Sequence, residues 1–202
     1  MRTRFVILLA VILCACSAVE AAPEPTADTT EVITLPVSIY ILDDDTGALS
    51  SGRTLNEIQG IFDNVDWIWR QAHISFDVKT IQRLTLPTVY LRAIALGNFE
   101  PLFGATQGDV FIPEPSLLNA FYAQYIGGPN GIALSNANMF FITDNPSVYH
   151  ERVTSHEIGH LLGLHHTLSD TNRLMYQGTN GMNLNEDEIR IARATARHLL
   201  DN

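Results

Sequence analysis

Cysteine and lysine are nearly absent from this chain of 202 residues. The two cysteines, Cys14 and Cys16, both lie near the N-terminus, so the rest of the chain can hold no internal disulfide. Lys79 is the only lysine, and 12 basic residues stand against 22 acidic ones, for a formal net charge of −10. Because nucleic-acid-binding proteins usually carry basic patches, this balance argues against a nucleic-acid partner.

The chain also lacks a long apolar run, since a membrane-spanning helix needs about 20 apolar residues. The run from Phe5 to Leu13 is too short for that, and two arginines, Arg2 and Arg4, precede it. This is the pattern of a secretory signal. We therefore expect the protein to be exported.

The end of this signal bears on membrane attachment. Leu13-Cys14-Ala15-Cys16 resembles a bacterial lipobox, which implies cleavage before Cys16 and a lipid anchor on that residue. Such an anchor would hold the protein on a membrane surface in the cell envelope. Cleavage near Ala18 or Ala21, which would release a free secreted protein, stays open.

The remaining composition indicates one folded domain after a tether. Residues 17–30 are small, acidic and contain two prolines, which is typical of an extended linker. Solenoid-length repeats are absent, and a hydrophobic fraction of 46% excludes wholesale disorder. We divide the chain into a signal peptide over 1–15, a flexible tether over 16–30 and a single domain over 31–202.

Hydrophobic periodicity predicts a mixed sheet packed against helices, an α+β fold. Thr54 and Glu57 form a capping-box pair at the start of a predicted helix. The expected strands are 32–41, 73–84, 109–112, 132–134 and 139–142, and the expected helices are 54–72, 117–125 and one opening at Asn185, with a strand or short helix over 89–96.

Five of the seven histidines lie between residues 150 and 166. His156 and His160 are four residues apart, which on a helix places both rings on one face, where they can bind one ion. Glu157 lies about 100° round the helix from His156, so it can reach a bound water more easily than the ion. Gly163 allows the helix to end, and the turn brings back His166. This arrangement predicts one catalytic Zn²⁺ bound by His156, His160 and His166, with a fourth position open for water.

Other residues could complete the predicted site. His165 is the nearest alternative ligand, but its spacing from Gly163 favours His166 and leaves His165 to solvent. In a different clan of zinc peptidases, Glu186 or Glu188 of the last helix would be the third ligand. Three imidazoles that converged without a metal would cost desolvation free energy, which disfavours a purely structural cluster.

The zinc-site segment resembles a known group of enzymes. His156-Glu157-x-x-His160-x-x-Gly163-x-x-His166 is similar to the zinc signature of the metzincin metallopeptidases. Arg173-Leu174-Met175-Tyr176 resembles their Met-turn, with Met175 beneath the metal, and the short gap before it is similar to matrixins, the matrix-metalloproteinase-like branch. The close resemblance spans about residues 150–200.

The resemblance implies a zinc-dependent endopeptidase with two lobes, an upper one over about 31–163 and a lower one over about 164–202. It further implies a protein or peptide substrate, and we expect a monomer. Glu157 would act as general base, taking a proton from water and returning it to the leaving amine. In the family the substrate pairs with an edge strand of the upper sheet, for which 131–134 and 139–142 are candidates.

The same resemblance leaves three questions open. Leu174, Tyr176 and Met182 predict an apolar pocket and a hydrophobic residue after the cut bond. The stretch that binds a second zinc and calcium in matrixins is not evident in 85–145, and Asp43 to Asp45 match no standard calcium loop, so structural calcium stays open. A non-catalytic zinc-containing surface lipoprotein is the alternative function, although the intact Glu157 argues against it.

Overall fold

The computed structural model describes residues 31–102, 113–114 and 116–201. The predicted signal peptide, the tether and the predicted strand over 109–112 lie outside the described residues. Within them, no helix has the length and apolar character needed to cross a membrane. The elements are β1 (Ile33–Asp44), α1 (Leu55–Trp69), η1 (Arg70–Ala72), β2 (Ile74–Leu86), α2 (Thr88–Ala95), β3 (Leu118–Ala123), β4 (Gly131–Leu134), η2 (Ser135–Ala137), β5 (Met139–Thr143), α4 (His150–Leu161) and α5 (Glu186–Leu200).

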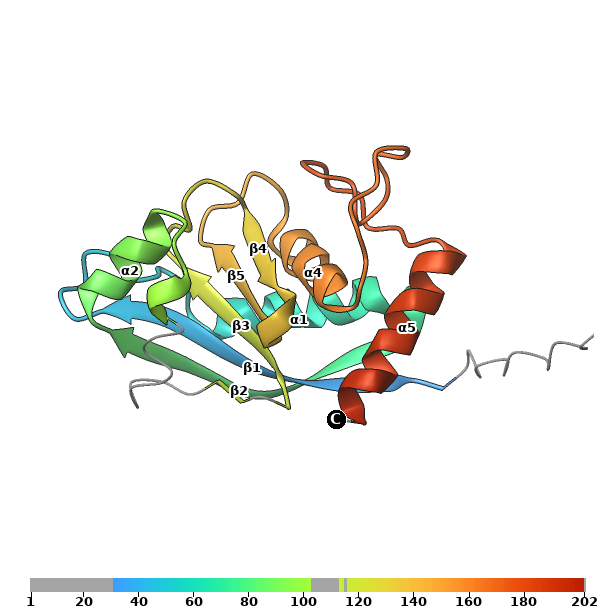
Figure 1. Ribbon diagram of the computed structural model, residues 1–202, viewed down its shortest axis with the longest axis horizontal. Coiled ribbons are helices and arrows are strands. Elements are labelled where there is room, and N and C mark those ends of the chain that lie inside the picture. Colours follow the sequence, from blue (N-terminus) through green and yellow to red (C-terminus); the bar gives the residue numbers. More distant parts are fainter. Residues whose placement is uncertain (1–30, 103–112, 115, 202) are drawn as a thin grey trace, which may run out of the picture.

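The strands form one mixed sheet in the order β2-β1-β3-β5-β4 (Figure 1). Strands β2, β1, β3 and β5 are parallel to one another, and β4 pairs antiparallel with β5. Strand β4 is therefore an edge strand, and α4 packs against it and against β5. A mixed sheet with helices confirms the predicted α+β fold.

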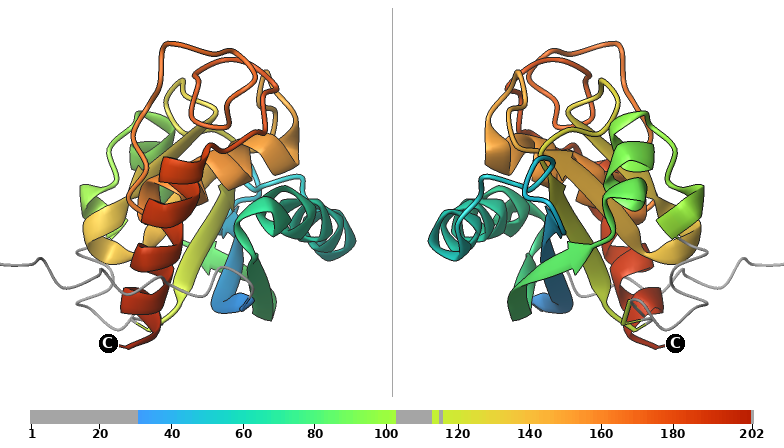
Figure 2. Two further views of the ribbon diagram at one scale, coloured as in Figure 1. Left: turned by 90° about the vertical axis from the view of Figure 1, so that its right-hand side faces the viewer. Right: turned by 90° about the vertical axis from the view of Figure 1, so that its left-hand side faces the viewer.

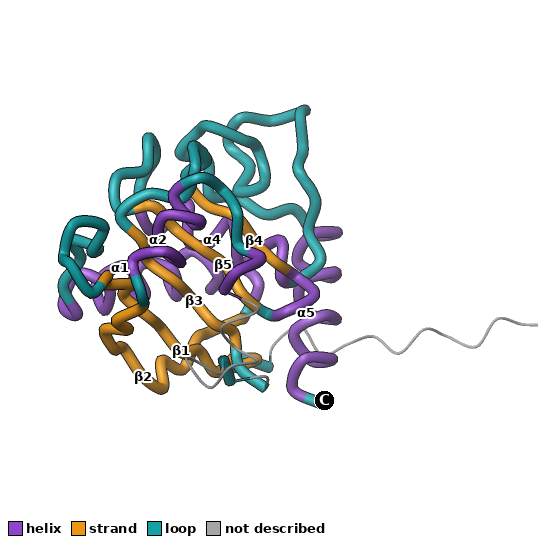
Figure 3. Tube along the Cα trace, turned by 60° about the vertical axis from the view of Figure 1, so that its left-hand side comes forward, coloured by secondary structure: helices purple, strands orange, loops and turns teal. Residues whose placement is uncertain are grey.

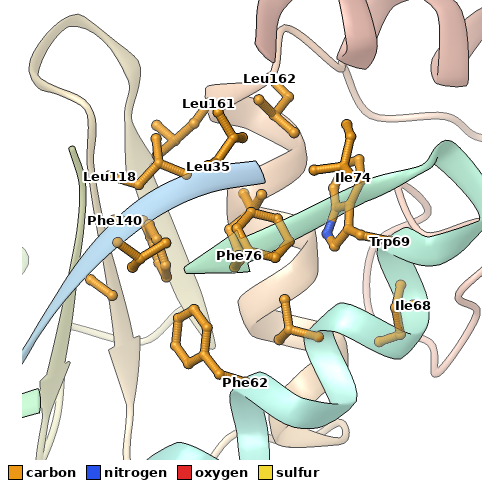
Figure 4. Packing of buried hydrophobic residues seen from close by; sticks show 14 of the residues in the cluster. Leu35, Phe62, Ile68, Trp69, Ile74, Phe76, Leu118, Phe140, Leu161 and Leu162 are labelled. Carbon is orange, nitrogen blue, oxygen red and sulfur yellow. The ribbon is translucent and has the colours of Figure 1, made fainter. Parts of the chain in front are cut away.

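Helices cover both faces of this sheet, as Figure 2 shows for α1 and α2. Side chains of successive strand residues point to opposite faces, so Ile39 and Ile41 pack with α1, α4 and α5, whereas Tyr40 and Leu42 pack with α2. Figure 4 shows the larger of the two cores, where side chains of α1 meet those of β1, β2 and α4. Helix α5 joins this core through Ala192 and Ala196.

Most of the predicted elements are confirmed. Helix α1 begins after Thr54, whose hydroxyl accepts from the Glu57 N–H while the Glu57 carboxylate accepts from the Thr54 N–H, so the predicted capping box is present. Helix α5 begins in the same way after Asn185. The segment that was predicted as a strand or a short helix is helix α2.

The helix predicted over 117–125 is wrong, because this segment forms strand β3. Strand β3 lies between β1 and β5, and both of its faces are covered. Phe121 and Tyr122 are neighbours that point to opposite faces, and both are fully buried. A strand buried on both faces has no polar alternation, so its apolar run resembles that of a buried helix.

The site lies where loops gather at one end of the sheet. Figure 3 shows these loops together, and they include the segment before β4 and the segment between α4 and α5. The boundary between two lobes at residues 163 and 164 stays a prediction.

Candidate metal centre

The end of α4 sets the position of the predicted third ligand. Gly163 adopts a left-handed conformation with φ 81°. The N–H of Gly163 donates to the carbonyl of His160, and the N–H of Leu164 donates to the carbonyl of Gly159. This pair of bonds is the Schellman arrangement, which ends a helix and reverses the chain. The chain therefore turns back on α4 and carries His166 toward the helix.

The three predicted ligands converge. His156, His160 and His166 form a cluster whose ligand atoms all lie within 4.8 Å of one another. The Nε2 atom of His166 is 3.1 Å from the Nε2 atom of His156 and 3.1 Å from that of His160. In a tetrahedral zinc site with Zn–N bonds of 2.0–2.1 Å, two ligand nitrogens are separated by about 3.3 Å. These two separations therefore fit zinc.

The protonation of the imidazoles also fits a cation. The Nδ1 atom of His156 lies 2.7 Å from the Leu174 carbonyl oxygen, and that of His160 lies 2.9 Å from the Leu164 carbonyl oxygen. A ring nitrogen that faces a carbonyl carries the proton, so both Nε2 atoms keep lone pairs directed at the centre of the cluster. Burial lowers the pKa of His156 to about 3, which keeps this ring neutral at physiological pH.

The predicted Met-turn packs directly beneath α4. Met175 is fully buried, and a Cβ added to Gly159 would lie only 2.6 Å from the Met175 sulfur. Gly159 precedes His160, so the thioether contacts the turn of α4 that carries the first two ligands. The neighbouring Leu174 carbonyl orients the His156 ring, as described above. The Met-turn segment thus supports the metal-binding face of the helix.

Glu157 is enclosed beside the triad. Its side chain accepts a hydrogen bond from the Ala133 N–H on edge strand β4, and only 5% of the residue is exposed. Burial raises the pKa of Glu157 to about 8, although the charge of Arg152 and the Ala133 N–H oppose the rise. Gly131 makes room for this side chain, since a Cβ there would lie 2.6 Å from the Glu157 Cγ.

A cleft of about 490 Å³ opens over these groups. Edge strand β4 forms one wall of the cleft. Helix α4 forms the other wall through Arg152, Val153, His156 and His160. Gln177 and Gly178 reach it from the segment between α4 and α5. The cleft therefore runs along the sheet edge and over the predicted metal position, which suits an extended ligand.

The alternative ligands do not join the triad in the described structure. His165 lines the cleft but is exposed, and it lies outside the cluster of convergent ligand atoms. The carboxylate of Glu188 pairs with Arg173 and accepts from the Asn185 N–H. His150 lies six residues before His156, and its Nδ1 atom is 2.8 Å from the Arg53 guanidinium.

The expected apolar pocket is not lined as predicted. Leu174 is fully buried in the main core, and Met182 packs against that core. The residues of this segment that line the cleft are Gln177 and Gly178. The side-chain directions in this irregular segment follow no period, so the apolar sequence was a poor guide to the surface facing the cleft.

Sequence reasoning missed Arg152. It named 131–134 as a candidate strand for substrate pairing, but it missed that Gly131 and Ala133 of this strand contact Glu157. Arg152 lies four residues before His156 on the same helix, so its place on the metal-binding face follows from helical spacing. No local signal marks the other two, because they reach Glu157 only through the packing of β4 on α4.

The fold and the site together define a zinc metallopeptidase of the metzincin class. The matrixin family model (Peptidase_M10) matches residues 62–194, which is most of the chain. The chain therefore belongs to the matrixin family and is a zinc-dependent peptidase.

Solved structures show the same fold at low sequence identity. The archaemetzincin of Methanopyrus kandleri is 16% identical, with a TM-score of 0.54 over 82% of this chain and 96% of that one. Metalloproteinase-II of Bacteroides fragilis is also 16% identical, with a TM-score of 0.56 over 82% of this chain and 55% of that one, so the present chain spans about half its length. No curated protein matches the sequence.

Proposed function

We propose that this protein is a matrixin-like endopeptidase that hydrolyses peptide bonds in extracytoplasmic proteins or peptides. The observation that carries the proposal is the convergence of three imidazole Nε2 atoms beside a buried carboxylate, at the base of a cleft along a sheet edge. His156, His160 and His166 would hold the zinc ion. A bound zinc ion lowers the pKa of a coordinated water and polarises the scissile carbonyl.

Glu157 is the general base in this proposal, because the positive charge of a bound zinc ion would favour its ionised carboxylate over the protonated form that burial favours in the metal-free site. Its carboxylate takes one proton from the attacking water, while the water oxygen bonds to the carbonyl carbon. The same proton then passes from Glu157 to the nitrogen of the leaving amine as the C–N bond breaks. The second water proton stays on the new carboxyl group and passes to the amine at neutral pH, so the products are one carboxylate and one ammonium group, and Glu157 returns to its starting state. Its enclosure by β4 keeps the carboxylate in one position for both transfers.

The substrate would lie extended along β4. An edge strand offers unpaired backbone groups to an added strand, and β4 both forms the edge and lines the cleft. The other candidate, Met139–Ile142, belongs to β5, which lies inside the sheet between β3 and β4. In this pose, the residue after the cut bond faces the wall formed by the segment from Thr167 to Met182.

A peptide library tests this function. The zinc-loaded protein should cleave library peptides, and a chelator should stop the cleavage until zinc is restored. The variant Glu157→Gln keeps the size of the side chain but cannot accept the proton, so its rate should fall by about 10²–10⁴-fold. Zinc content, measured in the same samples, should be unchanged. Cleavage by Glu157→Gln at the wild-type rate would refute the assignment of the base, and zinc binding without cleavage by either protein would favour a binding lipoprotein.

We further propose that the protein is exported and anchored through Cys16. The support is the apolar N-terminal run and the lipobox-like sequence that ends it. In a bacterial host, the wild-type protein should fractionate with membranes, and Cys16→Ser should become soluble in the periplasm or medium. Equal membrane association of both proteins would rule out the Cys16 anchor.

A further inference from the structure

The cleft contains a buried cation, the side chain of Arg152, and the proposed mechanism does not use this cation. Arg152 precedes His156 by one helical turn, lines the same cleft and is only 3% exposed. A guanidinium stays protonated at all physiological pH values, so this residue brings a fixed positive charge to the site. Its positive charge contributes to lowering the pKa values of His156 and His166, and it opposes the rise in the pKa of Glu157.

The hydrogen bonds of Arg152 leave part of its guanidinium unused. Its Nη2 atom donates to the Leu174 carbonyl oxygen at 2.9 Å and to the Tyr176 carbonyl oxygen. Its Nε atom is buried without a hydrogen-bond partner. Within the described part of the chain, no carboxylate oxygen lies within 4.0 Å of this guanidinium, whereas the nearby Arg173 pairs with Glu188.

The cleft does not supply the missing negative charge. Among the described residues that line it, Glu157 alone carries a carboxylate. In the proposed mechanism this carboxylate is committed to the water, and the zinc ion adds two further positive charges. A buried charge without a counter-charge is costly, and a guanidinium N–H donates a strong, charge-assisted hydrogen bond to a carboxylate. A carboxylate brought by the substrate therefore has the chemistry that completes this site.

We propose that Arg152 binds a carboxylate of the substrate, so that the peptidase selects an acidic residue directly after the cut bond. This inference rests on the proposed function, because the substrate pose places that residue against the wall from Thr167 to Met182. Arg152 donates to two carbonyls of that wall, at Leu174 and Tyr176, and so lies at its base. The carboxylate can come from a glutamate side chain or from the C-terminus of a short peptide.

Matched peptides distinguish the carboxylate of a glutamate side chain from that of a peptide C-terminus. One series carries Glu, Gln or Leu after the cut bond and is amidated at the C-terminus. A second pair ends at a Leu in that position, with either a free carboxylate or an amide. The wild-type protein should cleave the Glu peptide about tenfold or more faster, in kcat/KM, than the Gln peptide. If the protein prefers the free carboxylate in the second pair but shows no preference in the first series, Arg152 binds the C-terminal carboxylate of the substrate.

The variants test the role of Arg152 itself. Arg152→Met should lower the ratio of kcat/KM for the Glu peptide over the Gln peptide to about one, whereas Arg152→Lys should retain part of the preference. Arg190→Met is the matched control, since Arg190 is exposed on α5 and should keep the wild-type preference.

A binding measurement covers the case in which Arg152→Met disturbs the wall. Zinc-loaded Glu157→Gln, which keeps Arg152, should bind the Glu peptide about tenfold more tightly than the Gln peptide. Equal cleavage and equal binding of the Glu and Gln peptides, or a preference for Leu, would overturn the inference while leaving the peptidase intact. If no peptide is cleaved, the proposed function fails, and the binding ratio alone then decides whether Arg152 recognises a carboxylate.

Discussion

The contact between Gly131 and Glu157 makes a sharp prediction about catalysis. A Cβ at position 131 would lie 2.6 Å from the Glu157 Cγ and 2.7 Å from its Oε1. Ordinary contacts between carbon atoms begin near 3.4 Å, so in Gly131→Ala the carboxylate must withdraw by about 0.8 Å. A displacement of about 1 Å at a reacting group costs about 10²-fold in rate. We therefore expect kcat/KM of Gly131→Ala to fall by about 10²-fold.

The same geometry predicts what Gly131→Ala leaves unchanged. Gly131 does not adopt a positive φ, so alanine causes no backbone strain there. His156 and His160 keep their carbonyl partners, and zinc content should stay at the wild-type value. Because a side chain has to move and no backbone does, the free energy of unfolding should fall by no more than the ~1–3 kcal/mol that overpacking costs.

The assay compares peptide cleavage, zinc content and urea unfolding of three proteins. Gly60→Ala is the matched control, because Gly60 lies in α1 with no atom within 4 Å of an added Cβ. It should stabilise the protein by about 0.5–1 kcal/mol and leave kcat/KM unchanged. Wild-type activity of Gly131→Ala would refute the reasoning, since Glu157 would then not need its present position. Loss of zinc would refute it too, by showing that the substitution acts on the ligands.

Three further predictions concern packing, ligands and pH. Gly159→Ala would place a Cβ 2.6 Å from the Met175 sulfur, so urea unfolding should show a loss of about 1–3 kcal/mol. His166→Ala should abolish tight zinc binding in a competition titration with a chelator, whereas Glu186→Ala should bind zinc as the wild type does. Burial alone would raise the pKa of Asp44, but hydrogen bonds from neighbouring hydroxyl and amide groups outweigh it and lower that pKa. The resulting stabilisation is present above about pH 4 and is lost as the pH falls toward the folded-state pKa, so Asp44→Asn should flatten the acid limb of stability against pH.

Local sequence signals accounted for much of the fold. The capping pairs at Thr54 and Asn185 and the 3.6-residue periodicity after them depend on neighbours in the chain, so α1 and α5 were predicted correctly. The alternating apolar residues of β1 likewise reflect the local pleat. Strand β3 was missed because its apolar run arises from burial between β1 and β5, which no local pattern shows.

The wall of the cleft shows the same limit. Leu174, Tyr176 and Met182 predicted an apolar pocket, but the loop that carries them turns Leu174 into the core and presents Gln177 and Gly178 to the cleft. The direction of a side chain in an irregular segment depends on long-range contacts, such as the hydrogen bonds from Arg152 to this loop.

The sequence by itself determined that His156, His160 and His166 converge. His156 and His160 share a helix face because of helical geometry, and Gly163 ends the helix because it tolerates a left-handed conformation, so the spacing of all three is a local property. Only the tertiary structure decided the surroundings of these histidines. The packing of β4 on α4 encloses Glu157, and the folding of the loop after α4 buries Arg152 in the cleft without a carboxylate partner in the described part of the chain. These features depend on residues far apart in the sequence, so no local pattern could show them.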